Sequence, residues 1–386
     1  MQAALFDNAA LMIMLVGALV GIASTLVGTF LVLRGVSMLS DAIGHSIVFG
    51  IVIVWLITHQ QSGPVQIIGA ALTGLLTVFL TELLVSTRRV KKDAAIGLVF
   101  PVLFSAGVLL INLYARDVHI DTHTVLLGEI GFVWLDTLTL GDYRVPQALV
   151  WMGAMTLING AFVTLFYKEL KIATFDEALA KALGMAPGLL FYVLLLLTSG
   201  TAVAAFDAVG AVLFVAFVIV PPATGYLLTD RLWMMFIHGS LVSIASSISG
   251  YWLAVFWNVS IGGMMAVMTG VFLLLAFLLG PRYGMVAQVL RRRGQRRVNE
   301  IRTLAVHLYN HEDGPEQWAE NVTQALREHL LWDNAKANRV VARSREQGLV
   351  ECRGQSLVLT EAGRDMAREI LEPTRNGTGS LTTTAT

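Results

Sequence analysis

The sequence of 386 residues is 55% apolar and only 14% charged. Soluble proteins carry about 25% charged residues. The composition therefore excludes an ordinary soluble enzyme, a disordered chain and a coiled coil, and it indicates a membrane protein. Basic and acidic residues number 27 each, but residues 1–290 hold 12 basic and 14 acidic groups, whereas residues 291–386 hold 15 and 13.

These densities predict a transmembrane domain over 1–290, a soluble domain over 291–372 and a disordered tail over 373–386, which is rich in Thr and Gly. The single cysteine, Cys352, excludes an intrachain disulfide and a cysteine-based metal site. We expect no cleavable signal peptide, because the start lacks a basic segment and carries Asp7.

Apolar runs long enough to cross a bilayer as a helix, about 20 residues, fill most of the first 290 positions. They predict nine spans: 10–33, 40–58, 64–86, 93–114, 146–167, 188–205, 207–228, 233–255 and 262–280. Only Phe206 and Asp207 separate the sixth span from the seventh, so a total of eight or ten spans stays open. The expected fold class is an all-α polytopic membrane protein with a small α+β domain after it.

Basic residues concentrate in alternate loops, which predicts the orientation of the chain because such loops stay in the cytoplasm. One set of loops holds Arg34, the group at 88–92, three lysines between 168 and 181, Arg231, Arg282 and the run 291–293; the other holds only Arg116 and Arg144. We therefore expect the N-terminus outside, the segment 115–145 on the outer face and the C-terminal domain in the cytoplasm.

Asp41 and His45 stand at the start of the second predicted span. Placing an ionisable group inside the bilayer costs free energy, so such groups indicate function. The spacing of four between Asp41 and His45 puts both side chains on one helical face. A carboxylate with an imidazole suits a divalent transition metal: carboxylate favours manganese, and imidazole admits zinc and iron. In the alternative interpretation, Ser40 or Asp41 caps the helix and His45 bonds to a carbonyl.

Other ionisable groups in or beside the spans are weaker candidates. Glu82 and Asp207 are candidate pathway residues, although Glu82 is more often a helix-pairing group and Asp207 can cap the following helix. His238 reads as a hydrogen-bonded packing histidine. The outer segment 116–123 alternates acidic and imidazole groups, which suits either metal capture or a solvated loop, and 125–135 suggests a short re-entrant or interfacial helix.

The predicted inner loop at 167–184 reads as a short amphipathic helix that ends at Gly184, a helix-stop signal. Its mixed charge and its position between two spans suit a docking helix on the membrane surface. The sequence contains no Walker A motif, so ATP hydrolysis of that kind requires another chain.

Four stretches carry a family resemblance. They are 28–34 (GTFLVLR) continuing into 37–46 (SMLSDAIGHS); 123–130 (HTVLLGEI); 167–170 (YKEL) with 175–176 (FD) and 182–184 (ALG); and 208–213 (AVGAVL) with 221–224 (PPAT). In this order they resemble the permease subunits of ATP-binding-cassette importers for manganese, zinc and iron. The likeness covers roughly residues 10–280. Phe49 and the segment 261–264 depart from the family pattern, which bears on packing more than on chemistry.

The resemblance implies a multi-pass protein of a bacterial cell membrane that works with an identical or related permease chain, two cytoplasmic ATPase subunits and an extracytoplasmic metal-binding protein. It matches Asp41 and His45 to the metal pathway. It implies no permanently bound cofactor, with Mn²⁺, Zn²⁺ or Fe²⁺ as the transported ion. By the same resemblance, the ATPase-coupling helix includes Glu169, Phe175, Asp176, Glu177, Ala182 and Gly184.

The C-terminal region predicts helices at 298–310 and within 316–330, a helix from the cap Asp333 to 347, a hairpin over 349–359 turning near Gly354, and a last helix over 360–372. This order resembles the winged-helix domains of metal-dependent repressors. The basic run 291–297 is explained by topology alone.

The helix at 334–347 offers Lys336, Arg339, Arg343 and Arg345 for contact with DNA or a partner protein. The nearly balanced charge and the membrane tether argue against DNA. His307, His311 and His329 either sense metal or occupy ordinary surface positions. The preferred hypothesis is a non-enzymatic permease subunit of an ATP-driven metal importer, manganese first. A membrane-tethered, metal-responsive regulator and a secondary transporter that works alone are the alternatives.

Overall fold

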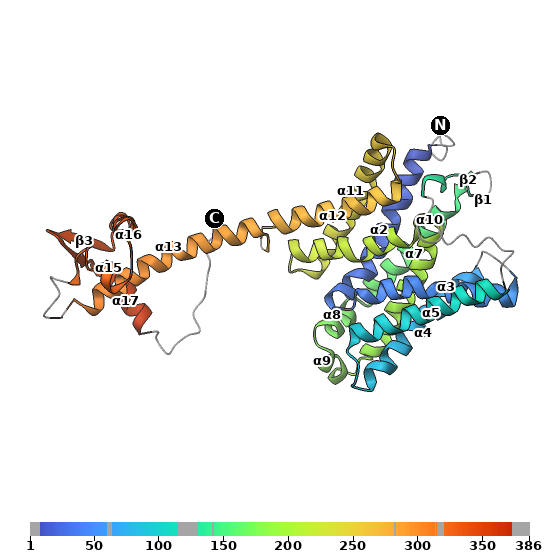
Figure 1. Cartoon of the computed structure of the whole chain (residues 1–386), viewed down its shortest axis with the longest axis horizontal. Coiled ribbons are helices and arrows are strands. Elements are labelled where there is room, and N and C mark those ends of the chain that lie inside the picture. Colours follow the sequence, from blue (N-terminus) through green and yellow to red (C-terminus); the bar gives the residue numbers. More distant parts are fainter. Residues whose placement is uncertain are drawn as a thin grey trace. The chain divides into compact units, whose positions relative to one another are not determined.

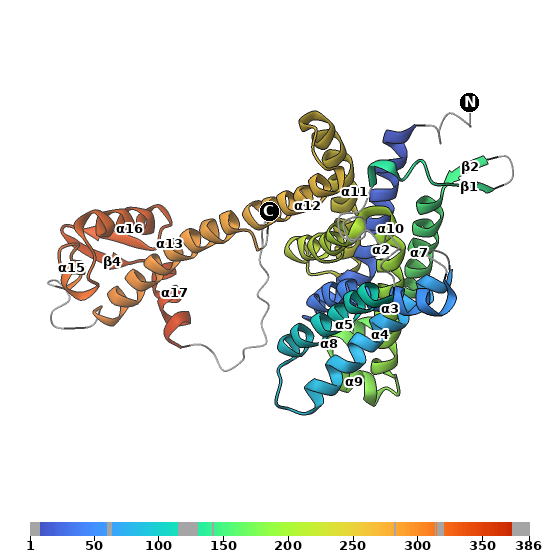
Figure 2. The ribbon, with the colours of Figure 1, turned by 45° about the vertical axis from the view of Figure 1, so that its right-hand side comes forward.

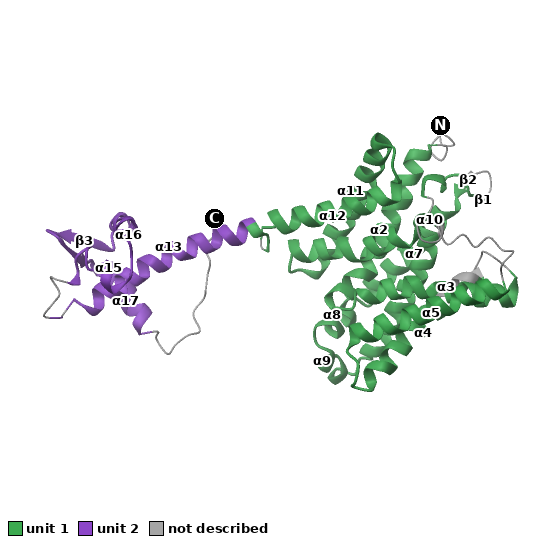
Figure 3. Cartoon of the chain, in the orientation of Figure 1, with its two compact units in different colours: residues 1–285 green, residues 286–386 purple. Residues whose placement is uncertain are grey.

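The computed structural model describes residues 8–59, 64–114, 130–140, 143–281, 283–312, 314 and 320–372. The chain forms two compact units, residues 1–285 and residues 286–386, which are coloured separately in Figure 3. We call them unit 1 and unit 2 and treat each by itself.

Unit 1 is built almost entirely from helices, which Figure 1 labels in chain order. They are α2 (Ala9–Leu33), α3 (Met38–Thr58), α4 (Pro64–Ser86), α5 (Lys92–Tyr114), α7 (Gln147–Leu165), α8 (Tyr167–Phe175), α9 (Glu177–Ala182), α10 (Pro187–Leu228), α11 (Leu232–Trp257) and α12 (Ile261–Leu279).

Within the described residues, eight helical segments are long and apolar enough to span a bilayer, and α10 supplies two of them, Pro187–Phe206 and Ala208–Leu228. Helix α4 occupies the position of a further predicted span and is apolar over Ala71–Ser86. The predicted all-α polytopic fold is confirmed.

The interruption within α10 lies at Gly210 rather than at Phe206 and Asp207. Gly210 has φ 77° and ψ 168°, outside the helical region, whereas Phe206 is buried within continuous helix. The predicted spans 188–205 and 207–228 match Pro187–Phe206 and Ala208–Leu228, and the break in helical geometry lies a few residues later, at Gly210. The physical reason is that an L side chain does not prevent helix continuation at Phe206 and Asp207, while only glycine readily adopts the backbone angles found at 210.

Helix α2 is the centre of unit 1, where α10 and α11 pack along it. Small residues allow this close approach: a Cβ on Gly28 would overlap the carbonyl oxygen of Val218. Buried polar groups join the same helices, because Asn159 of α7 donates through Nδ2 to Thr201 Oγ1 at 2.8 Å and to the Ala23 carbonyl at 3.2 Å.

Helices α3, α4 and α5 pack against one another, and they lie side by side in both Figure 1 and Figure 2. Ser46 of α3 and Thr77 of α4 are hydrogen-bonded at 2.6 Å, and both are fully buried. Ser46 directly follows His45, so this bond fixes the rotation of α3 about its axis and with it the direction in which His45 points.

The segment after α5 contains η1 (Ile130–Phe132) and an antiparallel hairpin of β1 (Thr137–Leu140) and β2 (Tyr143–Pro146). The hairpin was not predicted. The predicted short helix over 125–135 is represented among the described residues only by the single turn of η1, and the segment 116–123 lies outside them.

Unit 2 contains α13 (Met285–Asn310), α15 (Leu326–His329), α16 (Asn334–Glu346), the hairpin strands β3 (Val350–Arg353) and β4 (Ser356–Leu359), and α17 (Glu361–Leu371). Three predictions are confirmed: Asp333 caps α16, the hairpin turns at Gly354, and the last helix starts beside Thr360. The structure adds that Gly354 has a φ of 65° and that Thr360 caps α17.

Two expectations for unit 2 need correction. The helix predicted from 298 begins at Met285, so the basic run 291–297 is helical. Among the described residues of the segment 316–330, the named helix is a single turn, α15. Unit 2 has its own apolar core, in which α13, α16 and the hairpin meet through Leu304, Leu308, Val340 and Leu357.

Candidate functional site

Asp41 and His45 lie on one face of α3 and contact each other. His45 Nε2 is 3.4 Å from Asp41 Oδ1, and each side chain is about one-third exposed, at 34% and 33%. The N-cap of α3 is Ser37, which makes no side-chain capping bond, and Ser40 Oγ instead donates to the Ser37 carbonyl at 2.6 Å. The carboxylate and the imidazole are therefore paired with each other, and both are partly exposed at the surface of unit 1.

Two aromatic rings of α5 hold the imidazole in this position. The ring of His45 is stacked on Phe100 with centroids 5.6 Å apart, and it meets the edge of Phe104 at 6.1 Å. Because aromatic neighbours restrict the rotation of His45, its Nε2 stays directed at Asp41. The pair offers a carboxylate oxygen and an imidazole nitrogen to one bound ion, and the remaining coordination positions of that ion stay open.

Glu82 of α4 accepts a hydrogen bond from the hydroxyl of Tyr192 on α10. It also lines a cavity of about 400 Å³ together with Arg34, Lys92 and Glu177. Asp41 and His45 are not among the described residues that line this cavity. Glu82 therefore joins two helices, as its helix-pairing interpretation expects.

Asp207 lies within α10 by its backbone, three residues before the interruption at Gly210. Its side chain is outside the described part of the structure. His238 Nδ1 of α11 donates to the Met234 carbonyl at 2.7 Å, which agrees with its interpretation as a packing histidine.

The predicted docking helix consists of two short helices, α8 and α9, that meet at Asp176. Asp176 leaves the helical region, and its Oδ1 accepts from the Leu179 amide at 2.9 Å, which caps α9. Gly184 then ends the element with a φ of 77°, as predicted.

The surface of α8 and α9 combines apolar and charged groups. Lys181 Nζ lies 2.7 Å from Glu177 Oε1, and this ammonium lowers the pKa of the Glu177 carboxyl. Glu169 is half-buried and Ala182 is exposed. Three large apolar side chains are exposed, at 64%, 47% and 57%: Phe175, Leu179 and Leu183. Exposed large apolar side chains outside the spanning helices make α8 and α9 a candidate docking surface.

In unit 2, the basic residues of α16 line a groove against α13. This groove of about 380 Å³ includes Lys336, Arg339 and Arg343 from α16 and three arginines from α13, Arg293, Arg296 and Arg297. Arg345 lies in the last turn of α16. Lys336 Nζ is 3.4 Å from Glu300 Oε1 and 4.9 Å from the centroid of the Trp332 ring, so it is already engaged within the unit.

Comparison with known proteins gives the class of unit 1. Residues 7–280 match the family described as the ABC 3 transport family. The match covers more than half of the chain, so the chain belongs to this family.

Three individual proteins show how far the similarity extends. The chain is 44% identical to the zinc transport system membrane protein TroD of Treponema pallidum, over 93% of this chain and 98% of TroD. It is 48% identical to the manganese transport system membrane protein MntD of Bacillus subtilis, over 71% and 93%. It also resembles the solved structure of PsaBC from Streptococcus pneumoniae in complex with Fab, with 27% identity and a TM-score of 0.61, over 73% of this chain and 98% of that one.

Proposed function

We propose that this chain is the membrane subunit of an ATP-binding-cassette importer of manganese, zinc or iron, in which Asp41 and His45 contact the passing ion. The observation that carries the proposal is the paired carboxylate and imidazole on α3, 3.4 Å apart, in a chain that belongs to an ABC transport family. The chain itself is not an ATPase. ATP hydrolysis by partner subunits changes the conformation of the permease.

The pair suits a pathway better than a storage site. One carboxylate and one imidazole fill two coordination positions, whereas Mn²⁺, Zn²⁺ and Fe²⁺ take about four to six ligands. A second permease chain, identical or related, supplies a second pair if Asp41 and His45 lie near the dimer axis. The accessible third of each side chain supports this arrangement.

Manganese is our first choice for the transported ion, with zinc and iron as alternates. The carboxylate favours a harder ion and the imidazole accepts all three. The relatives support both of the first two metals, since MntD is named for manganese and TroD for zinc. Similarity to TroD extends over almost the whole chain, whereas similarity to MntD extends over 71% of it.

The partners follow from the class of transporter. We propose that α8 and α9 face the cytoplasm and dock on the ATPase through the exposed apolar patch of Phe175, Leu179 and Leu183. The N-terminus then lies outside, where a metal-binding protein delivers the ion, and the soluble part after residue 290 is cytoplasmic. The asymmetric distribution of basic residues supports this orientation.

The test is uptake of radioactive Mn²⁺ and Zn²⁺ by cells that carry Asp41→Ala or His45→Ala beside the wild-type partners. Loss of a group that holds a metal lowers affinity or activity by at least about tenfold, so we expect a drop of that size in both variants. His238→Ala is the matched control, because His238 is also a membrane histidine but bonds to the Met234 carbonyl. Equal amounts of each variant in the membrane are verified by immunoblot.

Uptake at wild-type rates in both variants would falsify the assignment of the pair. A loss in the His238→Ala control as large as that in His45→Ala would attribute the effect to packing and contradict it as well. Asp41→Glu, which keeps the carboxylate, should retain more uptake than Asp41→Ala.

We further propose that the soluble part, residues 291–372, is a winged-helix domain, with residues 373–386 as a disordered tail. The order of α13, α15, α16, the β3–β4 hairpin and α17 supports it. The basic groove between α13 and α16 supports the alternative of a regulator that binds DNA, and this alternative can be tested. The purified full chain in detergent should retard duplex DNA at low salt if that alternative holds, and Arg339→Ala with Arg343→Ala should abolish the shift.

A further inference from the structure

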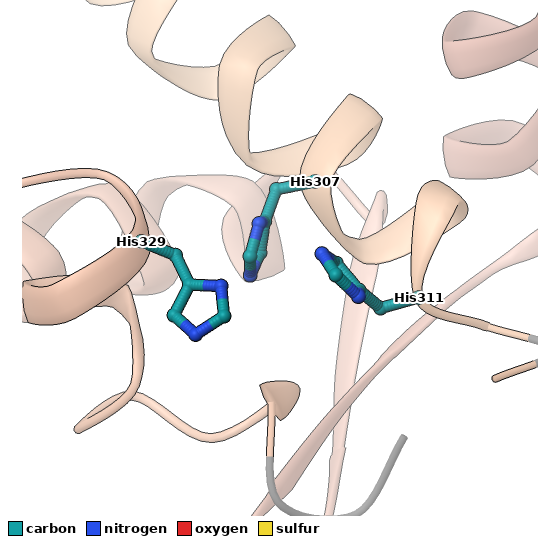
Figure 4. A group of neighbouring side chains, drawn as sticks. All are labelled: His307, His311 and His329. Carbon is teal, nitrogen blue, oxygen red and sulfur yellow. The ribbon is translucent and has the colours of Figure 1, made fainter. Parts of the chain in front are cut away.

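Unit 2 brings its three histidines together at one place. His307 lies on α13, His311 directly follows the end of that helix, and His329 lies on α15. The ring centroid of His307 is 4.7 Å from that of His311 and 5.5 Å from that of His329, and the last two rings are 5.8 Å apart. Figure 4 shows the three imidazoles gathered around a common space.

The local sequence explains this gathering. His307 and His311 are four residues apart, which places them on one face at the end of α13. Leu326, at the start of α15, is fully buried in the core of unit 2 and packs this single turn against the same region. One ligand atom from each histidine lies within 4.8 Å of the other two. Among the described residues, no other set of three metal-ligating side chains comes this close.

His307 provides an independent observation. It is only 7% exposed, and its Nε2 makes no hydrogen bond to any described residue. Burial and the neighbouring His311 imidazole lower the pKa of His307. Buried imidazole nitrogens normally have a partner, and an unpartnered one within a histidine cluster points to a ligand.

A carboxylate completes the set. Glu320 Oε2 contacts His311 Nδ1, and both side chains are partly buried. In metal sites such a carboxylate either orients a ligating histidine through its second nitrogen or serves as a ligand itself. The cluster thus contains three imidazoles and one acidic group, drawn from two helices and the segment between them.

We propose that His307, His311 and His329, assisted by Glu320, form a second metal site in the soluble unit that binds a divalent transition-metal ion, with Zn²⁺ as the best fit. Three histidines with a carboxylate or water satisfy the tetrahedral preference of Zn²⁺. Bonds of about 2.0–2.1 Å require ligand nitrogens roughly 3.3 Å apart, so the rings close inward by small rotations. Imidazole donors rank Zn²⁺ above Mn²⁺ and Fe²⁺.

This site goes beyond the proposed transport function and does not depend on it. An ion held by all three histidines connects α13 to α15 and therefore stabilises the fold of unit 2. If unit 2 is cytoplasmic, as proposed, the site is exposed to metal that has already entered the cell.

The experiment uses the full chain, purified in detergent, with Asp41→Ala and His45→Ala as the background so that the membrane pair contributes no binding. Zn²⁺ is titrated by calorimetry, and Co²⁺ is added as a spectroscopic probe. We expect one Zn²⁺ equivalent to depend on the cluster and Co²⁺ to give the strong visible absorption of a four-coordinate site. His329→Gln and His311→Gln should each weaken this binding by at least about tenfold.

His329 is exposed, so its replacement does not threaten the fold. Glu328→Gln is the matched control, since Glu328 is its exposed neighbour on the same helical turn. Thermal unfolding without metal verifies that all variants are equally folded, and added Zn²⁺ should raise the transition temperature in the Glu328→Gln chain but not in His329→Gln. The proposal is overturned if His329→Gln and Glu328→Gln bind the same number of Zn²⁺ equivalents with the same affinity and spectrum.

Discussion

Arg34 Nη2 donates a hydrogen bond to the carbonyl oxygen of Ala173 at 2.9 Å. The same guanidinium lies 4.7 Å from the ring centroid of Phe191. One side chain therefore connects the end of α2 to α8, the proposed docking helix, and to the first turns of α10. Because α2 is the centre of unit 1 and packs along α10 and α11, this residue links α8 to the central helices of unit 1.

Replacing Arg34 by Gln should loosen α8 without unfolding the protein. A hydrogen bond to a charged group contributes about 1.5–3 kcal/mol, so we expect faster amide exchange over 167–184, measured by hydrogen–deuterium exchange, together with lower uptake per ATP hydrolysed. Lys171→Gln, which removes an exposed cation from the same helix, should change neither quantity. Unchanged exchange in Arg34→Gln would contradict the linking role.

Gly28→Ala should destabilise unit 1 through overpacking. An added Cβ would overlap the carbonyl oxygen of Val218 on α10, and backbone cannot move aside as a side chain can. Overpacking costs about 1–3 kcal/mol, which should appear as a lower unfolding temperature in detergent. Gly153→Ala is the control, because a Cβ at Gly153 meets nothing within 4 Å. If both variants melt alike, close approach of α2 and α10 is not what the glycine provides.

Gly210→Ala should be harmful for a different reason, namely backbone strain. The angles φ 77° and ψ 168° are accessible essentially to glycine alone, and an L residue there costs about 1–3 kcal/mol. Asn tolerates a positive φ only with a much smaller ψ. Gly210→Asn should therefore lower stability and uptake as much as Gly210→Ala does. Full stability of Gly210→Asn would show that α10 can be continuous at this point.

Phe175→Ser should weaken binding of the ATPase subunit while leaving the permease folded. Phe175 is 64% exposed on α8, so it contributes little to the packing of unit 1. Truncating a residue that anchors an interface costs about 2 kcal/mol or more of binding, which co-purification and titration of the ATPase would measure. Phe132→Ser changes an aromatic residue of similar exposure, 61%, on η1 and should bind the ATPase normally.

The parts of the fold that the sequence predicted are those that depend on local pattern. Apolar runs identified the spanning helices, and the cap Asp333 located α16. The spacing of Asp41 and His45 predicted their contact, because four residues on a helix make neighbours regardless of what surrounds them.

Two of the features that were not predicted depend on contacts between segments far apart in the sequence. A third, the β1–β2 hairpin, has a local sequence signal. Tyr192 is 110 residues from Glu82, and no local pattern reveals that they are hydrogen-bonded. The convergence of His329 with His307 depends on the packing of α15 in the core of unit 2. The β1–β2 hairpin had a signal, since alternating Thr and Leu over 137–140 precede Gly141 and Asp142, a pair typical of hairpin turns.

The two-ligand pair on α3 has a consequence for speed. A site that surrounds its ion completely, as structural zinc sites do, holds it with apparent free energies of about 10–16 kcal/mol, and the ion then dwells far longer than a transport cycle lasts. A conduit must bind strongly enough to admit the ion and weakly enough to release it. In the proposed pathway, Asp41 and His45, supported by Phe100 and Phe104, would leave most of the coordination sphere to water or a partner, and the dwell time of the ion would be short enough for rapid turnover.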